Sequence, residues 1–150
     1  MTYIDRILVT EDDALLRRIF ESIARLSEIE IDMVESAERA LDTIKKRSSE
    51  NLSYPVILTD IVMPGMKGLT LINKIWEFVD SGQILQPEIY VMSGACCNYD
   101  REISLIIREG KIKGFYEKPF DTKKIFEELN EIKMLVFEGR LAQYRTASSR

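Results

Sequence analysis

The sequence predicts an α/β protein with one parallel sheet buried between helices. Short apolar runs alternate with amphipathic stretches along the chain, which is the pattern of repeated β-α units. Most of the apolar runs contain too few polar residues to expose one face of a sheet to water, so helices should cover both faces. At 150 residues and 45% hydrophobic content, the chain is large enough for one compact core.

Five β-α units are predicted, and the strand of the first unit lies at 7–10. A second strand is predicted at 29–34, followed by a helix that Ser36 caps. Strands at 56–59, 88–92 and 114–117 begin the remaining units. Between strands, apolar residues recur at intervals of three and four, the spacing of a helix face that packs on a sheet. These stripes are Leu15, Leu16, Ile19, Phe20, Ile23 and Leu26; Ala37, Ala40, Leu41 and Ile44; Leu69, Ile72, Ile75, Trp76 and Val79; Ile103, Ile106 and Ile107; and Ile125, Phe126, Leu129, Ile132 and Val136.

Two polar stretches interrupt this periodicity, at 47–55 and 80–87. Both contain Ser or Gly together with Pro or Asn and are predicted to be loops rather than domain linkers. The sequence contains no internal repeat and no low-complexity tract. We therefore predict one domain over residues 1–137, followed by a basic tail over 138–150, for which disorder is one interpretation.

Composition argues against several classes of function. A net charge of −4 gives no sign of the basic face of nucleic-acid-binding proteins, so direct contact with DNA or RNA is not expected. No run approaches the roughly 18 apolar residues of a membrane helix. Residues 1–6 lack the basic and apolar regions of a signal peptide. We therefore expect a cytoplasmic protein that does not bind membranes.

The residue types available also limit the chemistry. The chain has no histidine, which excludes Ser-His-Asp and Cys-His nucleophile pairs and most zinc hydrolase sites. Its two cysteines, Cys96 and Cys97, are adjacent. A disulfide between neighbours is strained, and two thiols alone make a poor zinc site, so we interpret both as reduced thiols. Carboxylates, hydroxyls and lysine remain as candidate functional groups.

Polar residues follow several of the predicted strands. They are Glu11 and Asp12, Asp60, Ser93, and Lys118. The carboxyl ends of the strands lie at one edge of an open parallel sheet, so these side chains should converge. Clustered carboxylates repel one another unless a proton or a cation neutralises them. Oxygen ligands favour a hard divalent cation, most simply Mg²⁺.

Such a site suits phosphoryl chemistry. One carboxylate can attack phosphorus while a metal, an ammonium group and a hydroxyl contact the phosphoryl oxygens, which describes an aspartyl-phosphate site. The order of the motifs, an acidic pair, Asp60 before Met63-Pro64-Gly65, Ser93-Gly94-Ala95 and then Lys118-Pro119-Phe120, resembles the receiver domain of bacterial response regulators, the CheY-like superfamily. The resemblance covers residues 6–133. It implies a flavodoxin-like (βα)5 three-layer sandwich with a parallel five-stranded sheet of order 2-1-3-4-5.

The resemblance also implies a role for each site residue. Asp60 would accept the phosphoryl group. Asp12 would ligate Mg²⁺ directly, Glu11 would hold it mainly through water, and the backbone carbonyl of Val62 would supply another ligand. Lys118 would contact the phosphoryl group. No other reaction is implied, so the chain is expected to be a phosphoacceptor signalling protein that catalyses only its own phosphorylation and dephosphorylation.

By the same resemblance, Ser93 is the switch hydroxyl, Phe115 is the switch aromatic, and the Lys118–Pro119 peptide bond is cis. A phosphoryl group carries a charge of about −2, which should draw Ser93 toward it and turn Phe115 inward. This would remodel the face formed by the helix around 103–107, the strand at 114–117 and the helix from 125, which is the family's usual partner face.

Three positions depart from the commonest pattern of the family: Glu11 replaces Asp, Ser93 replaces Thr, and Phe115 replaces Tyr or another aromatic residue. Each replacement keeps the required charge, hydroxyl or ring. Val62 and Ala95 line the site in the family and are nonpolar here. They offer no group that positions water, so we hypothesise that self-dephosphorylation is not accelerated.

The expected partners are a sensor histidine kinase or phosphotransfer protein and a downstream protein target. After the receiver region only a helix and a short tail remain, too little for a DNA-binding or enzymatic output domain, so a single-domain response regulator is expected. The stripe on the last helix, with Met134, Val136 and Phe137, is wider than one sheet-facing seam needs. It predicts either a longer docked helix or a homodimer or partner surface.

Each motif alone has a plainer interpretation. Asp12 or Asp13 could cap a helix, Ser93 could be a loop residue, Lys118 a solvated lysine and Phe115 a core aromatic. Their joint placement favours one site.

A haloacid-dehalogenase-like phosphatase would need a second Asp at Val62, and neither Gly-rich phosphate-loop motif occurs. The remaining alternative is a pseudo-receiver that binds partners without phosphorylation.

Overall fold

The computed structural model describes residues 6–94 and 100–148. Its strands are β1 (Ile7–Thr10), β2 (Ile31–Val34), β3 (Val56–Asp60), β4 (Glu88–Ser93) and β5 (Gly114–Glu117). Its helices are α1 (Ala14–Leu26), α2 (Ala37–Ser49), α3 (Gly68–Asp80), α4 (Asp100–Arg108) and α5 (Thr122–Ser148). The strands pair in parallel in the order β2-β1-β3-β4-β5. The flavodoxin-like fold expected from the sequence is confirmed.

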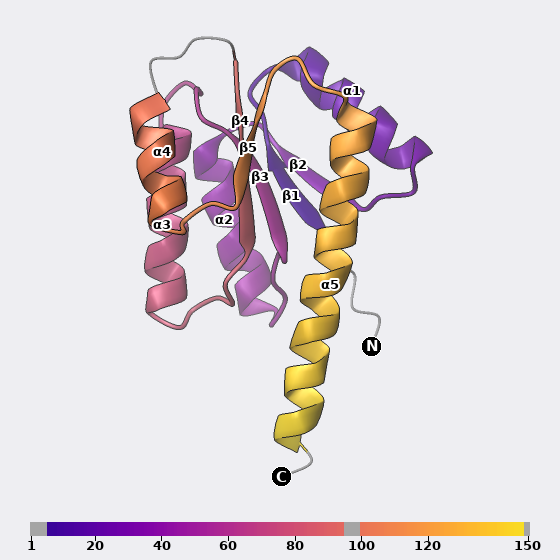
Figure 1. Ribbon diagram of the computed structural model, residues 1–150, viewed down its shortest axis with the longest axis vertical. Coiled ribbons are helices and arrows are strands. Elements are labelled where there is room, and N and C mark those ends of the chain that lie inside the picture. Colours follow the sequence, from indigo (N-terminus) through magenta and orange to yellow (C-terminus); the bar gives the residue numbers. More distant parts are fainter. Residues whose placement is uncertain (1–5, 95–99, 149–150) are drawn as a thin grey trace.

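The two faces of the sheet carry separate hydrophobic clusters, because side chains alternate between the faces along each strand. Leu8, Ile57 and Ile89 face one cluster, which α2, α3 and α4 cover. Val9 and Leu58 face the other, where they meet side chains of α1 and α5. Figure 1 shows the resulting three layers, with α1 and α5 on one side of the sheet and α2, α3 and α4 on the other.

The structure corrects part of the predicted α1 stripe. Phe20 and Ala24 are buried, whereas Leu15 is 67% exposed and Leu26 is 85% exposed. A helix that lies on a sheet buries a stripe only about 100° wide, and the predicted apolar set was wider than that. The prediction that Leu15 and Leu26 pack on the sheet was therefore wrong. The start of β2 also differs, since this edge strand begins at Ile31 instead of residue 29.

Helix α5 is longer than the sequence suggested. It runs without a break to Ser148, so no change of secondary structure marks the predicted boundary after residue 137. Its first turns are anchored by Ile125, Phe126 and Leu129, which are buried against the sheet, whereas Met134 and Leu135 are exposed. Figure 1 shows the C-terminal part of α5 projecting beyond the end of the sheet. No helix within the described residues is long and apolar enough to cross a membrane.

Candidate functional site

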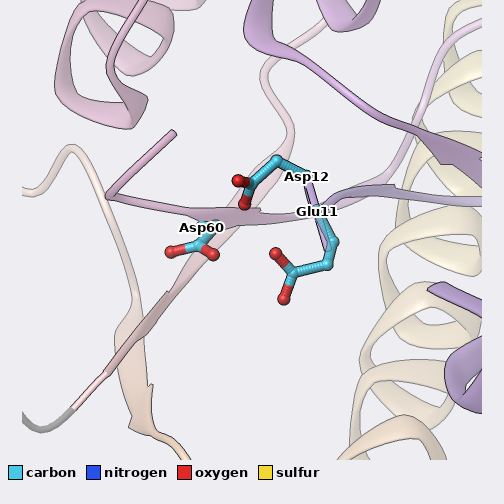
Figure 2. A group of neighbouring side chains, drawn as sticks. All are labelled: Glu11, Asp12 and Asp60. Atoms are coloured by element: carbon cyan, nitrogen blue, oxygen red, sulfur yellow. The ribbon is translucent and has the colours of Figure 1, made fainter. Parts of the chain in front are cut away.

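Three carboxylates meet at the carboxyl edge of the sheet. Glu11 and Asp12 follow β1, and Asp60 is the last residue of β3. These strands are neighbours whose register pairs Thr10 with Thr59, so the residues that come next lie side by side. Glu11, Asp12 and Asp60 each offer an oxygen atom, and these atoms lie within 4.8 Å of one another. Figure 2 shows the three carboxylate groups gathered in this way.

The members of this cluster differ in burial. Glu11 is fully buried and Asp60 is only 5% exposed, whereas Asp12 is exposed. Burial, followed by the hydrogen bond and the charge of Asp60, raises the pKa of Glu11 to about 7. Lys118 acts in the opposite direction but does not cancel these effects. A buried carboxylate whose charge is disfavoured in this way is receptive to a cation.

Lys118 supplies positive charge to the cluster. Its Nζ donates hydrogen bonds to Oδ2 of Asp60, at 2.8 Å, and to Oε1 of Glu11. Burial by itself lowers the pKa of Lys118, but the hydrogen bonds and charges of Asp60 and Glu11 raise it above the ordinary value. The side chain is therefore an ammonium group at neutral pH. The Lys118–Pro119 peptide bond is cis.

Asp12 and Asp13 have separate functions. Oδ1 of Asp13 accepts hydrogen bonds from the backbone N–H groups of Leu15 and Leu16, at 2.8 and 3.1 Å, and so caps α1. Capping by Asp13 satisfies the first turn of the helix. The side chain of Asp12 instead contributes to the acidic cluster. The predicted Ser36 cap of α2 is also present, since its Oγ accepts from the N–H of Arg39 at 3.1 Å.

The loop between β3 and α3 holds the Asp60 carboxylate. The backbone N–H of Val62 donates to Oδ1 of Asp60 at 3.2 Å. The loop closes where the N–H of Gly68 donates to the carbonyl of Ile61 at 3.0 Å. A Cβ atom on Gly68 would lie 2.2 Å from the Asp60 carbonyl oxygen, so only glycine fits there. This turn therefore positions Asp60 rather than merely reversing the chain.

Ser93 and Phe115 are not members of the cluster. Ser93 ends β4 and is buried, and its Oγ donates to the carbonyl of Gly94 at 3.1 Å. Phe115, on β5, is 45% exposed, so the interpretation of it as a core aromatic was wrong. Ala95 and the two cysteines, Cys96 and Cys97, lie outside the described residues.

Sequence reasoning missed two residues that support the site. Nη1 of Arg17 donates to the backbone carbonyls of Glu11 and Asp12, at 2.9 and 2.7 Å. Oε1 of Glu38, on α2, accepts from the backbone N–H of Met66 at 2.8 Å. Both act on backbone atoms, which any residue type provides. No sequence motif could have signalled them.

The donor set fits a hard cation. Among the described residues, the cluster offers carboxylate oxygens and no soft ligand, and Mg²⁺ and Ca²⁺ prefer oxygen ligands. Glu11 and Asp60 are buried, whereas Asp12 is exposed, so the cluster is open to solvent on the side of Asp12. The arrangement can therefore hold a metal beside a carboxylate that also contacts an ammonium group.

Comparison with known proteins gives the family. A family model described as the response regulator receiver domain matches residues 7–130. This chain belongs to that family. The two-component response regulator ARR6 of Arabidopsis thaliana is 30% identical to this chain over an alignment of 140 residues, which covers 87% of this chain and 72% of the plant protein. ORR6 of Oryza sativa subsp. japonica is 32% identical over 113 residues, 75% of this chain and 62% of the relative.

Solved structures agree with the fold of the receiver domain. The CheY-like response regulator receiver domain protein from Methanospirillum hungatei JF-1 superposes with a TM-score of 0.70. It is 22% identical to this chain, and the superposition covers 89% of this chain and 98% of the solved chain. At this identity the likeness concerns the fold. The chain spans only part of the length of each plant relative above.

Proposed function

We propose that Asp60 accepts a phosphoryl group from a phosphohistidine of a sensor histidine kinase or phosphotransfer protein. Receiver domains are signalling domains that interact with such proteins. The observation that supports this acceptor is its setting: Asp60 is nearly buried, lies within 4.8 Å of two other carboxylates, and accepts a hydrogen bond from the Lys118 ammonium at 2.8 Å. This combination suits a carboxylate nucleophile better than a purely structural ion pair.

In the proposed transfer, a carboxylate oxygen of Asp60 forms a bond to phosphorus while the bond from phosphorus to the imidazole nitrogen breaks. The imidazole leaves with the electron pair of that bond, and the product is an acyl phosphate. Lys118 is already within hydrogen-bond distance of Asp60. Its ammonium group can therefore stabilise the negative charge of the phosphoryl oxygens once they are bonded to Asp60. Ser93 would donate its hydroxyl to another phosphoryl oxygen.

Glu11, Asp12, Asp60 and the backbone carbonyl of Val62 are the groups that would hold Mg²⁺. The proposal is supported by the oxygen atoms of the three carboxylates, which lie within 4.8 Å of one another. When bound, Mg²⁺ supplies positive charge that neutralises the phosphoryl oxygens. Glu11 would contribute mainly through water and Asp12 directly. The chain itself holds Lys118 between Glu11 and Asp60, which limits repulsion before a cation binds.

The output of this proposal is a changed protein surface. The phosphoryl group would draw Ser93 toward it, and Phe115, which is exposed in this structure, would turn inward. The altered face of α4, β5 and α5 would then bind a downstream protein target. A homodimer through this face is a further part of the proposal, supported by the exposed Met134 and Leu135 on α5.

The experiment is incubation of the full chain with acetyl phosphate and Mg²⁺, followed by intact-mass measurement. We expect a mass increase of one phosphoryl group for the wild type and none for Asp60→Asn. Omission of Mg²⁺ should abolish the adduct as well. A wild-type chain that binds partners but never gains the adduct would favour the alternative, a pseudo-receiver scaffold.

A further inference from the structure

Glu38 reaches from α2 to the loop that carries Asp60. Glu38 lies in the first turn of α2, a helix that contributes no member of the acidic cluster. Oε1 of Glu38 accepts a hydrogen bond from the backbone N–H of Met66 at 2.8 Å. A Cβ atom on Gly65 would lie only 2.9 Å from the same oxygen. The backbone of the β3–α3 loop therefore passes directly against this carboxylate.

The hydrogen bond from Met66 favours the charged form of Glu38. That bond, followed by those from the N–H of Glu38 itself and from Ser36, lowers the pKa of Glu38 below its ordinary value. The side chain is therefore a carboxylate at neutral pH, and its contact with Met66 is charge-assisted. Gly65 has φ +77°, a conformation that glycine adopts without strain, which lets the loop turn toward Glu38.

The same loop orients Asp60. Its first part is tied to the sheet, because the N–H of Ile61 donates to the carbonyl of Met92 at 3.1 Å. The next residue, Val62, donates its N–H to Oδ1 of Asp60 at 3.2 Å. Four residues later Met66 is held by Glu38. A shift of the loop at Met66 would therefore move the donor that fixes one oxygen of Asp60.

We propose that Glu38 is a positioning residue: by anchoring the β3–α3 loop at Met66, it holds Val62 where its N–H orients Asp60 for binding the cation. The inference rests on the proposed function of the acidic cluster. Glu38 is not a member of the cluster. It acts through the backbone, as partners outside the ligand set commonly do.

The test measures the dissociation constant for Mg²⁺ by calorimetry on the full chain. We expect Glu38→Ala to weaken Mg²⁺ binding about tenfold, the low end for loss of such an outer partner. Glu38→Gln keeps an oxygen acceptor for Met66 and should restore most of the affinity. The matched control is Asp42→Ala, which removes one negative charge from an exposed site on the same helix and should leave the affinity close to that of the wild type.

A second variant disrupts the contact between Glu38 and Met66 by a change in the loop. Gly65→Ala would push the Glu38 carboxylate away from Met66 in addition to straining a positive φ. In the Glu38→Ala background there is no carboxylate for the new methyl group to displace. The loss of Mg²⁺ affinity in the double variant should therefore be smaller than the two single losses combined. Additive losses would contradict the proposed contact.

The readouts separate the inference from the proposed function. A wild type without measurable Mg²⁺ affinity would overturn the proposed function. A wild type that binds Mg²⁺ equally well after Glu38→Ala, or a Glu38→Gln variant as weak as Glu38→Ala, would overturn the positioning role alone. Amide NMR without metal gives an independent check, since Glu38→Ala should shift the signals of Val62 and Met66 while Asp42→Ala should not.

Discussion

Lys118 donates a hydrogen bond to Asp60 at 2.8 Å, although 58 positions separate the two residues in sequence. Asp60 ends β3 and Lys118 follows β5, and β4 lies between these strands in the sheet. The contact therefore depends on the register of three strands. The same ammonium also binds Glu11, so one cation serves two buried carboxylates.

Replacing Lys118 by methionine should destabilise the chain by about 3 kcal/mol near neutral pH, because it leaves buried charges without their partner. Lys113→Met is the control, since Lys113 makes only a 3.8 Å pair with Glu88 at the surface, and such pairs contribute at most about 1 kcal/mol. Urea unfolding measures both free energies. Equal losses of unfolding free energy in the two variants would show that Lys118 stabilises the fold no more than a surface ion pair does.

Stability without metal should fall as pH rises from 4.5 to about 7, the window between the ordinary pKa of Glu11 and its raised value in the folded chain. The folded state binds the extra proton in this window, so its advantage is lost as the proton leaves. The proposed Mg²⁺ site requires the deprotonated form of Glu11, so Mg²⁺ should stabilise the fold more at about pH 8 than at about pH 5. Unfolding free energies with and without Mg²⁺ measure this, and the pH effect should vanish in Glu11→Gln.

The adjacent residues Asp12 and Asp13 should give opposite results. Asp13→Ala removes the cap of α1 and should cost about 1 kcal/mol of unfolding free energy, with Mg²⁺ affinity nearly unchanged. Asp12→Ala should weaken Mg²⁺ binding by more than about tenfold, because it removes a proposed ligand rather than an outer partner, with little loss of stability. Calorimetry and urea unfolding on both variants test this, and exchanged outcomes would reverse the two assignments.

Arg17→Ala should weaken Mg²⁺ binding, because the guanidinium of Arg17 holds the carbonyls of both Glu11 and Asp12. We expect a loss of about tenfold, as for other groups that orient ligands. Arg18→Ala removes the same charge from the next, exposed position and is the matched control. If both variants lost affinity equally, long-range charge rather than the carbonyl contacts would be responsible.

Phe115 should become less exposed when beryllofluoride, a phosphoryl mimic, is added with Mg²⁺. Its ring is 45% exposed in this structure, and the switch that we propose turns it inward once Ser93 moves toward the mimic. A crystal structure of the beryllofluoride complex measures the exposed fraction. Ser93→Ala should leave the ring exposed under the same conditions. Identical exposure of Phe115 with and without the mimic would contradict the switch.

Much of the fold was readable from local patterns. The apolar runs gave the strands to within two residues, and the motifs at their ends pointed to a receiver fold whose strand order the structure confirms. The errors came where local periodicity overstates burial. Leu15 and Leu26 continue the apolar pattern of α1 but remain exposed, because how much of a helix is covered depends on the elements beside it.

The sequence alone determined which residue types were available and at which strand ends they stood, because strand periodicity and turn chemistry are local properties. That was enough to single out Glu11, Asp12, Asp60 and Lys118. Only the tertiary structure decided that Asp13 rather than Asp12 caps α1, and that Arg17 and Glu38 hold the surrounding backbone. The contacts of Arg17 and Glu38 join side chains to backbone atoms of other segments, so they depend on how the helices pack beside the sheet and leave no mark in the sequence.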